Sequence, residues 1–197
     1  MNTPTKLTVS RIVMAIVLMI IMIFPFSSIG IDVPVLRFGI DLSLKYVICA
    51  LLFIVASITD FFDGYLARKN KEVTDLGKML DAIADKVLVN PILIIFASEG
   101  IISPIIPVII VTRDIVVNAI KMEAARSGKA VAAISSGKIK TASLMVGIVL
   151  LFLVNVPFVF INIRVDLLLI YFATIMSLAS MIEYYKLNKN IFKKEII

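Results

Sequence analysis

The sequence predicts an all-α integral membrane protein, a bundle of six membrane-spanning helices forming a single domain over residues 1–197. Hydrophobic residues make up 60% of the 197-residue chain, and the mean hydropathy is +1.05. Soluble domains contain only roughly 45–50% apolar residues. The length accommodates about six stretches of about 20 residues, each long enough to cross the hydrocarbon core of a bilayer. Little chain is left for a further domain.

Six apolar stretches follow one another along the chain, and turn-forming residues separate them. They cover residues 7–26, 41–66, 78–98, 104–125, 139–159 and 166–186. The first is longer than the core of a signal peptide and no small-residue cleavage pattern follows it, so we expect a span rather than a removed leader. Cys49 is the single cysteine, which excludes an intramolecular disulfide.

Lysine and arginine residues are divided unevenly between the two sets of loops that six spans create. One set includes both termini and holds Lys6, Arg11, Arg68, Lys69, Lys71, Lys78, Arg126, Lys129, Lys138, Lys140, Lys186, Lys189, Lys193 and Lys194; the other holds Arg37, Lys45 and Arg164. Cytoplasmic loops carry the basic excess, so we expect the termini on the cytoplasmic side. We expect no nucleic-acid binding, because these residues follow membrane sidedness and form no stripe with aromatic residues.

Four aspartates lie within or beside the second and third apolar stretches. Asp60 and Asp63 are three residues apart and Asp81 and Asp85 are four apart, so each pair shares one helix face. The short basic link between the two helices makes them antiparallel neighbours, which lets all four carboxylates converge. An ionised carboxylate in a membrane helix costs at least about 2.5 kcal/mol, so each requires a partner or a function. The chain has no histidine, and an all-oxygen cluster favours one or two Mg²⁺ or Mn²⁺ ions.

Other interpretations of these aspartates stay open. Ion pairs with Arg68, Lys78 or Lys86 would make them structural, but Lys78 and Lys86 neutralise at most two of the four charges. A pathway for a divalent cation, as in a carrier, explains acids inside helices but not their compact spacing with small residues. A structural scaffold would tolerate the exchange of an aspartate for asparagine.

Written from Asp60 to Asp85, these residues read D-x-x-D-G-x-x-A-R-x8-G-x-x-x-D-x-x-x-D. The pattern resembles the signature of the CDP-alcohol phosphotransferase family at every motif position. The resemblance implies a six-helix bundle, usually a homodimer, in the bacterial cell membrane. It also implies an active site that opens toward the cytoplasm and displaces CMP from a CDP-linked lipid.

The resemblance assigns roles to the motif residues. It makes Asp60, Asp63 and Asp81 metal ligands, and it makes Asp85 both a ligand of a second metal and the candidate catalytic base. The residues expected to receive the CDP-lipid are Thr8, Asp60, Gly64, Ala67, Arg68 and Gly77. A guanidinium such as that of Arg68 offers paired donors to phosphate. Thr8 fits an alternative role as the N-cap of the first helix.

Similarity beyond the signature covers most of the chain from Asn2 to Gly147. The segments Asn2–Arg11, Thr112–Asp114 and Gly137–Thr141 resemble bacterial family members whose acceptor is sn-glycerol 3-phosphate, which implies transfer from CDP-diacylglycerol to that alcohol. Arg113, Lys138 and Lys140 are the candidate binding residues for the acceptor phosphate, while Arg113 could instead pair with Asp114. These cations fit an inositol phosphate equally well, and serine or a phosphatidyl lipid is a further alternative acceptor.

Overall fold

The computed structural model describes residues 3–37, 39–69, 75–126 and 134–193. Within these ranges the chain forms six α-helices: α1 (Thr3–Ile23), α2 (Leu44–Lys69), α3 (Asp75–Ser98), α4 (Ile105–Arg126), α5 (Ser135–Phe152) and α6 (Val165–Lys193). The shorter elements are the strands β1 (Val35–Arg37) and β2 (Asp41–Ser43) and the 3-10 helices η1 (Phe26–Ile29) and η2 (Phe158–Ile161). The predicted number of helices is confirmed.

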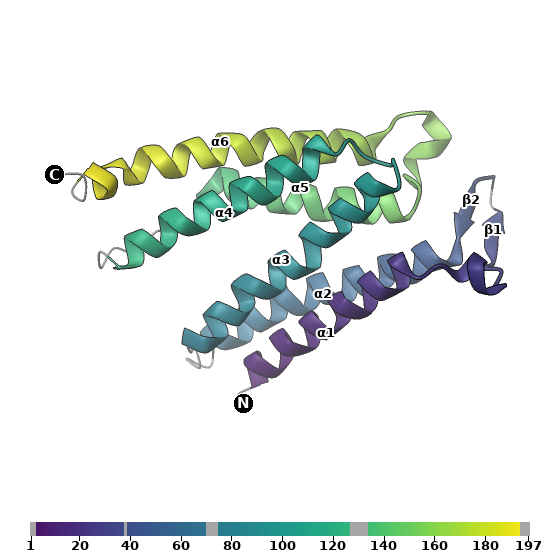
Figure 1. Ribbon diagram of the computed structural model, residues 1–197, viewed down its shortest axis with the longest axis horizontal. Helices are drawn as coiled ribbons and strands as arrows, with labels where there is room; N and C mark the ends of the chain where they lie inside the picture. Colours follow the sequence, from purple (N-terminus) through teal and green to yellow (C-terminus); the bar gives the residue numbers. More distant parts are fainter. Residues whose placement is uncertain (1–2, 38, 70–74, 127–133, 194–197) are drawn as a thin grey trace.

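The helices form two groups of three (Figure 1). In one group, α1 packs against both α2 and α3; in the other, α6 packs against both α4 and α5. Smaller contacts between α2 and α5 and between α3 and α4 join the groups. Successive helices run in opposite directions, so α1 begins at the same end of the bundle at which α6 finishes (Figure 1). The β1–β2 hairpin lies at the opposite end.

Aromatic side chains join the two groups at the core. The ring centroids of Phe96 on α3 and Phe152 on α5 are 4.8 Å apart, and that of Phe53 on α2 is 6.3 Å from Phe152. All three side chains are fully buried. Within the second group, Gly147 lets α5 approach α6 closely, because a Cβ there would lie 2.9 Å from the Cδ1 of Ile170.

Two helix boundaries differ from the predicted ones because of local backbone structure, and α6 continues past its predicted end at residue 186 to Lys193. Residues 41–43 belong to β2, which pairs with β1 from Val35↔Ser43 to Arg37↔Asp41, so α2 begins only at Leu44. The fifth apolar stretch was predicted to reach residue 159, but α5 ends at Phe152 because Val154 and Asn155 adopt positive φ. The Asn155 side chain then donates to the Ile163 carbonyl and accepts from the Asp166 N–H, which fixes the start of α6.

The surface of the bundle is that of a membrane protein. By length and composition, three helices in the described part of the chain could cross a bilayer, over Thr5–Ile23, Ser135–Phe152 and Val165–Lys189. Large apolar side chains such as Ile20, Val108 and Ile175 are more than half exposed. The helices α3 and α4 carry charged residues in their interiors, and these residues line the site described below.

Candidate active site

A polar cavity of about 550 Å³ lies between the two groups of helices. Every helix except α1 contributes to its described lining. Five residues that the sequence predicted for the site line it together: Asp60, Asp85, Arg113, Lys138 and Lys140. These residues come from α2, α3, α4 and α5, so the fold brings the predicted acidic residues and the predicted basic residues to one cavity.

A buried arginine joins the two aspartate-bearing helices. Arg11 on α1 is fully buried; its Nη1 pairs with Asp60 on α2 and its Nη2 lies 3.0 Å from the Oδ1 of Asp81 on α3. The interpretation of Arg11 as a loop charge is therefore wrong. Asp60 and Asp81 both pair with this residue, which was not among the partners considered from the sequence. Thr8, one helical turn before Arg11, is also buried.

The carboxylates of Asp60 and Asp81 lie close enough to share one cation, since both contact the same guanidinium. One guanidinium neutralises only one of their two charges. Oxygen donors of this kind suit a hard divalent ion, so the residues fit the expected metal. Among the residues with described side chains, no three Asp, Glu, His or Cys residues are arranged to hold a metal ion. Asp63 is also a predicted ligand, but its side chain is not among the described ones.

A second charged cluster lies on α4 and α5. Asp114 accepts a hydrogen bond of 2.8 Å from the Nη1 of Arg113, and the Nζ of Lys140 lies 3.2 Å from the same carboxylate oxygen. Arg113 and Lys140 are both buried. The alternative considered for Arg113, an ion pair with Asp114, is present, and Arg113 nonetheless lines the cavity. Asp114 therefore holds two cations of the site side by side.

The cavity wall carries a positive charge balance. Its cations are Lys86, Arg113, Lys121, Lys138 and Lys140, and its carboxylates are Asp60, Asp85 and Asp114. Among the described lining residues, five positive and three negative groups leave a formal excess of two positive charges. Such an excess in a partly desolvated cavity favours a phosphate dianion. Sequence reasoning did not place Lys86, Lys121 or Asp114 at the site, although each is a charged residue inside an apolar helix, which is the signal that could have found them.

Three of the remaining predicted site residues lie outside the described lining of the cavity, and others have no described side chain. Thr8, Gly77 and Asp81 lie outside its lining, although Asp81 reaches Asp60 through Arg11. Gly64, Ala67 and Arg68 belong to α2, but their side chains lie outside the described set. Their predicted roles in binding the CDP-lipid stay predictions.

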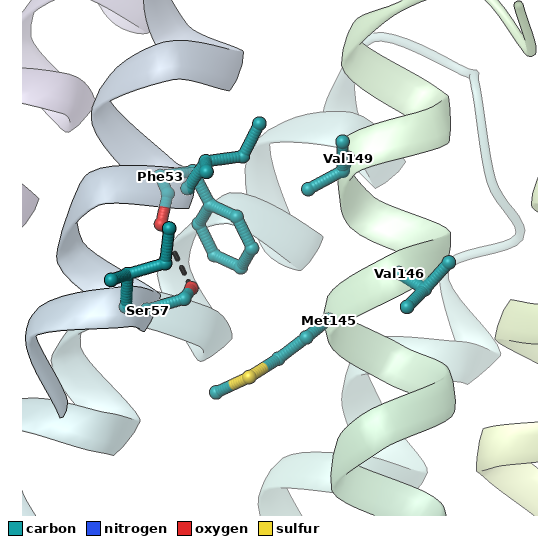
Figure 2. A pocket seen from close by; sticks show the side chains of 7 residues that line it. Phe53, Ser57, Met145, Val146 and Val149 are labelled. Carbon is teal, nitrogen blue, oxygen red and sulfur yellow. Dashed lines mark hydrogen bonds between the residues drawn. The ribbon is translucent and has the colours of Figure 1, made fainter. Parts of the chain in front are cut away.

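An apolar pocket of about 350 Å³ lies between α2 and α5, beside the polar cavity. Figure 2 shows Phe53 and Ser57 facing Met145 and Val149 across it. The hydroxyl of Ser57 donates a hydrogen bond of 2.8 Å to the Phe53 carbonyl, so its donor has a partner within α2. Met145 lines both this pocket and the polar cavity. The apolar pocket therefore adjoins the charged site.

A membrane-embedded helical bundle with aspartates converging from α2 and α3 is the arrangement that the signature predicted. The chain belongs to the CDP-alcohol phosphatidyltransferase family, whose model matches residues 1–182. It is an enzyme of this family, and the family generally depends on a divalent metal.

Three relatives carry the name CDP-diacylglycerol--glycerol-3-phosphate 3-phosphatidyltransferase. The chain is 35% identical to the one from Bacillus subtilis over 187 residues, which cover 95% of both chains. It is 36% identical to the one from Sodalis glossinidius over 157 residues, or 77% of this chain and 76% of the relative. It is 39% identical to the one from Rickettsia bellii over 120 residues, which cover 61% of this chain and 58% of the relative.

Replacement of Arg11 by methionine leaves the Asp60 and Asp81 carboxylates without their shared cation. We expect the free energy of unfolding in detergent micelles to fall by about 1–3 kcal/mol. This loss is smaller than for a fully buried pair, because the Asp81 side chain is 55% exposed. Adding Asp60→Asn to Arg11→Met should recover part of the loss, since it removes one of the two repelling charges.

The matched control is Arg126→Met, which breaks an exposed pair with Glu123 and should cost less than about 1 kcal/mol. Equal unfolding curves for Arg11→Met and Arg126→Met would contradict a stabilising role for the Arg11 bridge.

Proposed function

We propose that this enzyme transfers the phosphatidyl group of CDP-diacylglycerol to sn-glycerol 3-phosphate, giving phosphatidylglycerol phosphate and CMP. The observation that carries the proposal is the polar cavity, which brings two of the predicted aspartates, Asp60 and Asp85, together with the predicted phosphate-binding cations in a lining with a positive excess. The names of the relatives from three bacteria support the choice of both substrates.

We assign the donor to the aspartate end of the site. Asp60, Asp63, Asp81 and Asp85 would hold Mg²⁺ or Mn²⁺, which supplies charge neutralisation at the pyrophosphate and at the departing CMP. The close approach of the Asp60 and Asp81 carboxylates to one cation supports this assignment. The other candidates for holding the CDP group are Thr8, Gly64, Ala67, Arg68 and Gly77.

We assign the acceptor to the basic end of the same cavity. Arg113, Lys138 and Lys140 would bind the phosphate of glycerol 3-phosphate through charge-assisted hydrogen bonds. Asp85, which also lines this cavity, would take the proton of the attacking hydroxyl. The acceptor oxygen bonds to the phosphorus that carries diacylglycerol, and the bond from that phosphorus to CMP breaks. The protein acts mainly by orienting the two substrates.

The apolar pocket between α2 and α5 supports a lipid donor. Ile58, which lines it, is two residues from Asp60, and both Ile58 and Val146 are more than half exposed on the outside of the bundle. An acyl chain in this pocket would keep its apolar surface out of water while its headgroup reaches the polar cavity. We therefore place part of one acyl chain there.

We further propose a homodimer in the bacterial cell membrane, with both termini and the active site on the cytoplasmic side, and a single catalytic domain over residues 1–197. The basic excess in the loops on the side of the termini supports the orientation. The family resemblance supports the dimer.

Release of CMP by purified protein tests the proposed reaction. CDP-diacylglycerol is supplied with Mg²⁺ or Mn²⁺, and with glycerol 3-phosphate, inositol phosphate, serine or no acceptor in parallel. We expect release that requires glycerol 3-phosphate and stops when the metal is chelated. Release with another alcohol would retain the chemistry and reject the acceptor. An absence of metal-dependent release with all acceptors would favour a divalent-cation carrier.

The aspartate assignments predict that Asp60→Asn, Asp81→Asn and Asp85→Asn each reduce CMP release by at least about 100-fold, because each removes a charge that the reacting groups require. Asp41→Asn is the control, since Asp41 is an exposed residue of the distant hairpin. Size-exclusion profiles and melting temperatures in detergent establish that the variants fold. Normal turnover in a folded variant would remove that aspartate from the catalytic assignment.

The acyl-chain assignment predicts that Val149→Trp, which fills the apolar pocket, raises the KM for CDP-diacylglycerol in mixed micelles. Loss of two buried methylene groups, at about 0.8 kcal/mol each, corresponds to about a tenfold rise. The KM for glycerol 3-phosphate should not change. Val13→Trp places the same ring on the exposed face of α1, where Val13 is 53% exposed, and should leave both constants unaltered. An unchanged lipid KM in Val149→Trp would place the chain elsewhere.

A further inference from the structure

We infer that Ser180 and Tyr184 of α6 are positioning residues that hold the cations of the acceptor-phosphate site. The inference rests on the proposed function and extends it to a helix outside the segments that carry the predicted site. The two residues are four apart, so they share one face of α6. Both are buried, at 0% and 3% exposed.

Tyr184 lies against two cations of α4. The Cζ of Arg113 is 5.9 Å and the Nζ of Lys121 is 5.1 Å from the centre of its ring. Both distances are within the range in which a cation is attracted to an aromatic face. The ring is fixed in turn by Val117 and Ile120 of α4, with which it forms a small buried apolar cluster.

The hydroxyl of Tyr184 connects α6 to the beginning of α5. It accepts a hydrogen bond of 3.4 Å from the backbone N–H of Ile134, the residue immediately before α5. Two residues later, the Ser136 hydroxyl lies 2.6 Å from the carboxylate of Glu183. Lys138 and Lys140 follow directly on α5, so α6 sets the position of the turn that presents them.

Ser180 and Asp114 bind different terminal nitrogens of Arg113. The Ser180 hydroxyl donates to the Ser177 carbonyl at 2.9 Å, which leaves its lone pairs to accept the Arg113 Nη2 at 2.6 Å. The Nη1 of Arg113 is bound to Asp114 at 2.8 Å. The guanidinium is therefore fixed by a carboxylate, a hydroxyl and a ring while it still lines the cavity.

The chemistry of these two partners explains why they suit an anion site. A carboxylate at either position would hold the cations equally well, but it would cancel one of the two excess positive charges of the cavity. A hydroxyl and an aromatic ring hold Arg113 and Lys121 without changing the charge. The acceptor phosphate then meets cations that are oriented in advance by partners on α6 that add no negative charge.

Steady-state kinetics of Tyr184→Leu, Tyr184→Phe and Ser180→Ala test the inference. We expect Tyr184→Leu to raise the KM for glycerol 3-phosphate by about 3- to 30-fold, because the ring face is lost. The KM for CDP-diacylglycerol should stay at the wild-type value. Tyr184→Phe retains the ring and should recover most of the affinity, and Ser180→Ala should raise the same KM without affecting the lipid. Tyr171→Leu, at an exposed position of α6, should change neither constant.

Direct binding of glycerol 3-phosphate, measured by calorimetry on the metal-loaded protein in micelles, separates this inference from the proposed reaction. Binding that weakens in Tyr184→Leu and Ser180→Ala supports the inference even if wild-type protein releases no CMP. If wild-type protein releases CMP with glycerol 3-phosphate but both variants bind it normally, the inference is wrong and the reaction stands. An equal rise of both KM values would show that α6 acts only on the overall structure, and it would also overturn the inference. Should Tyr184→Leu fail to fold, Ser180→Ala alone decides.

Discussion

The bridge from Arg11 to Asp60 and Asp81 is the interaction on which the placement of the aspartates in the candidate site depends. It joins three helices at one point, and it does so with a guanidinium from which bulk water is excluded. The two aspartates would otherwise repel each other at the meeting point of α2 and α3. Arg11 of α1 thus holds the two carboxylates close together. A divalent cation bound by both would require such a short separation.

The second group of helices brings positively charged side chains together. Asp114 draws Arg113 and Lys140 together, and neutral partners on α6 complete the arrangement. The two groups meet through limited contacts, and the cavity lies where they meet. Asp60 and Asp85 come from the first group, and Arg113, Lys138 and Lys140 come from the second. Packing between the groups therefore sets the distance between these two sets of side chains.

The sequence predicted the parts of this architecture that depend on local spacing. Six apolar stretches gave six helices, and the Asp60–Asp85 pattern identified the family. Contacts between distant residues were inaccessible: Arg11 and Asp81 are 70 positions apart, and Arg113 and Ser180 are 67 apart. The early end of α5 depends on Asn155, whose side chain bonds to residues beyond the following turn. The spacing of apolar residues along the sequence does not indicate such side-chain hydrogen bonds.

Met145 marks the border between an apolar pocket and a charged cavity, and this border has a consequence for how the two substrates arrive. In the proposed reaction, a lipid donor that enters beside α2 and α5 would diffuse in the plane of the bilayer and need never leave it. A phosphorylated alcohol arrives by three-dimensional diffusion from the aqueous phase. The two search processes do not compete for one entrance, so the local abundance of the lipid in the membrane and the concentration of the alcohol in water can limit the rate independently.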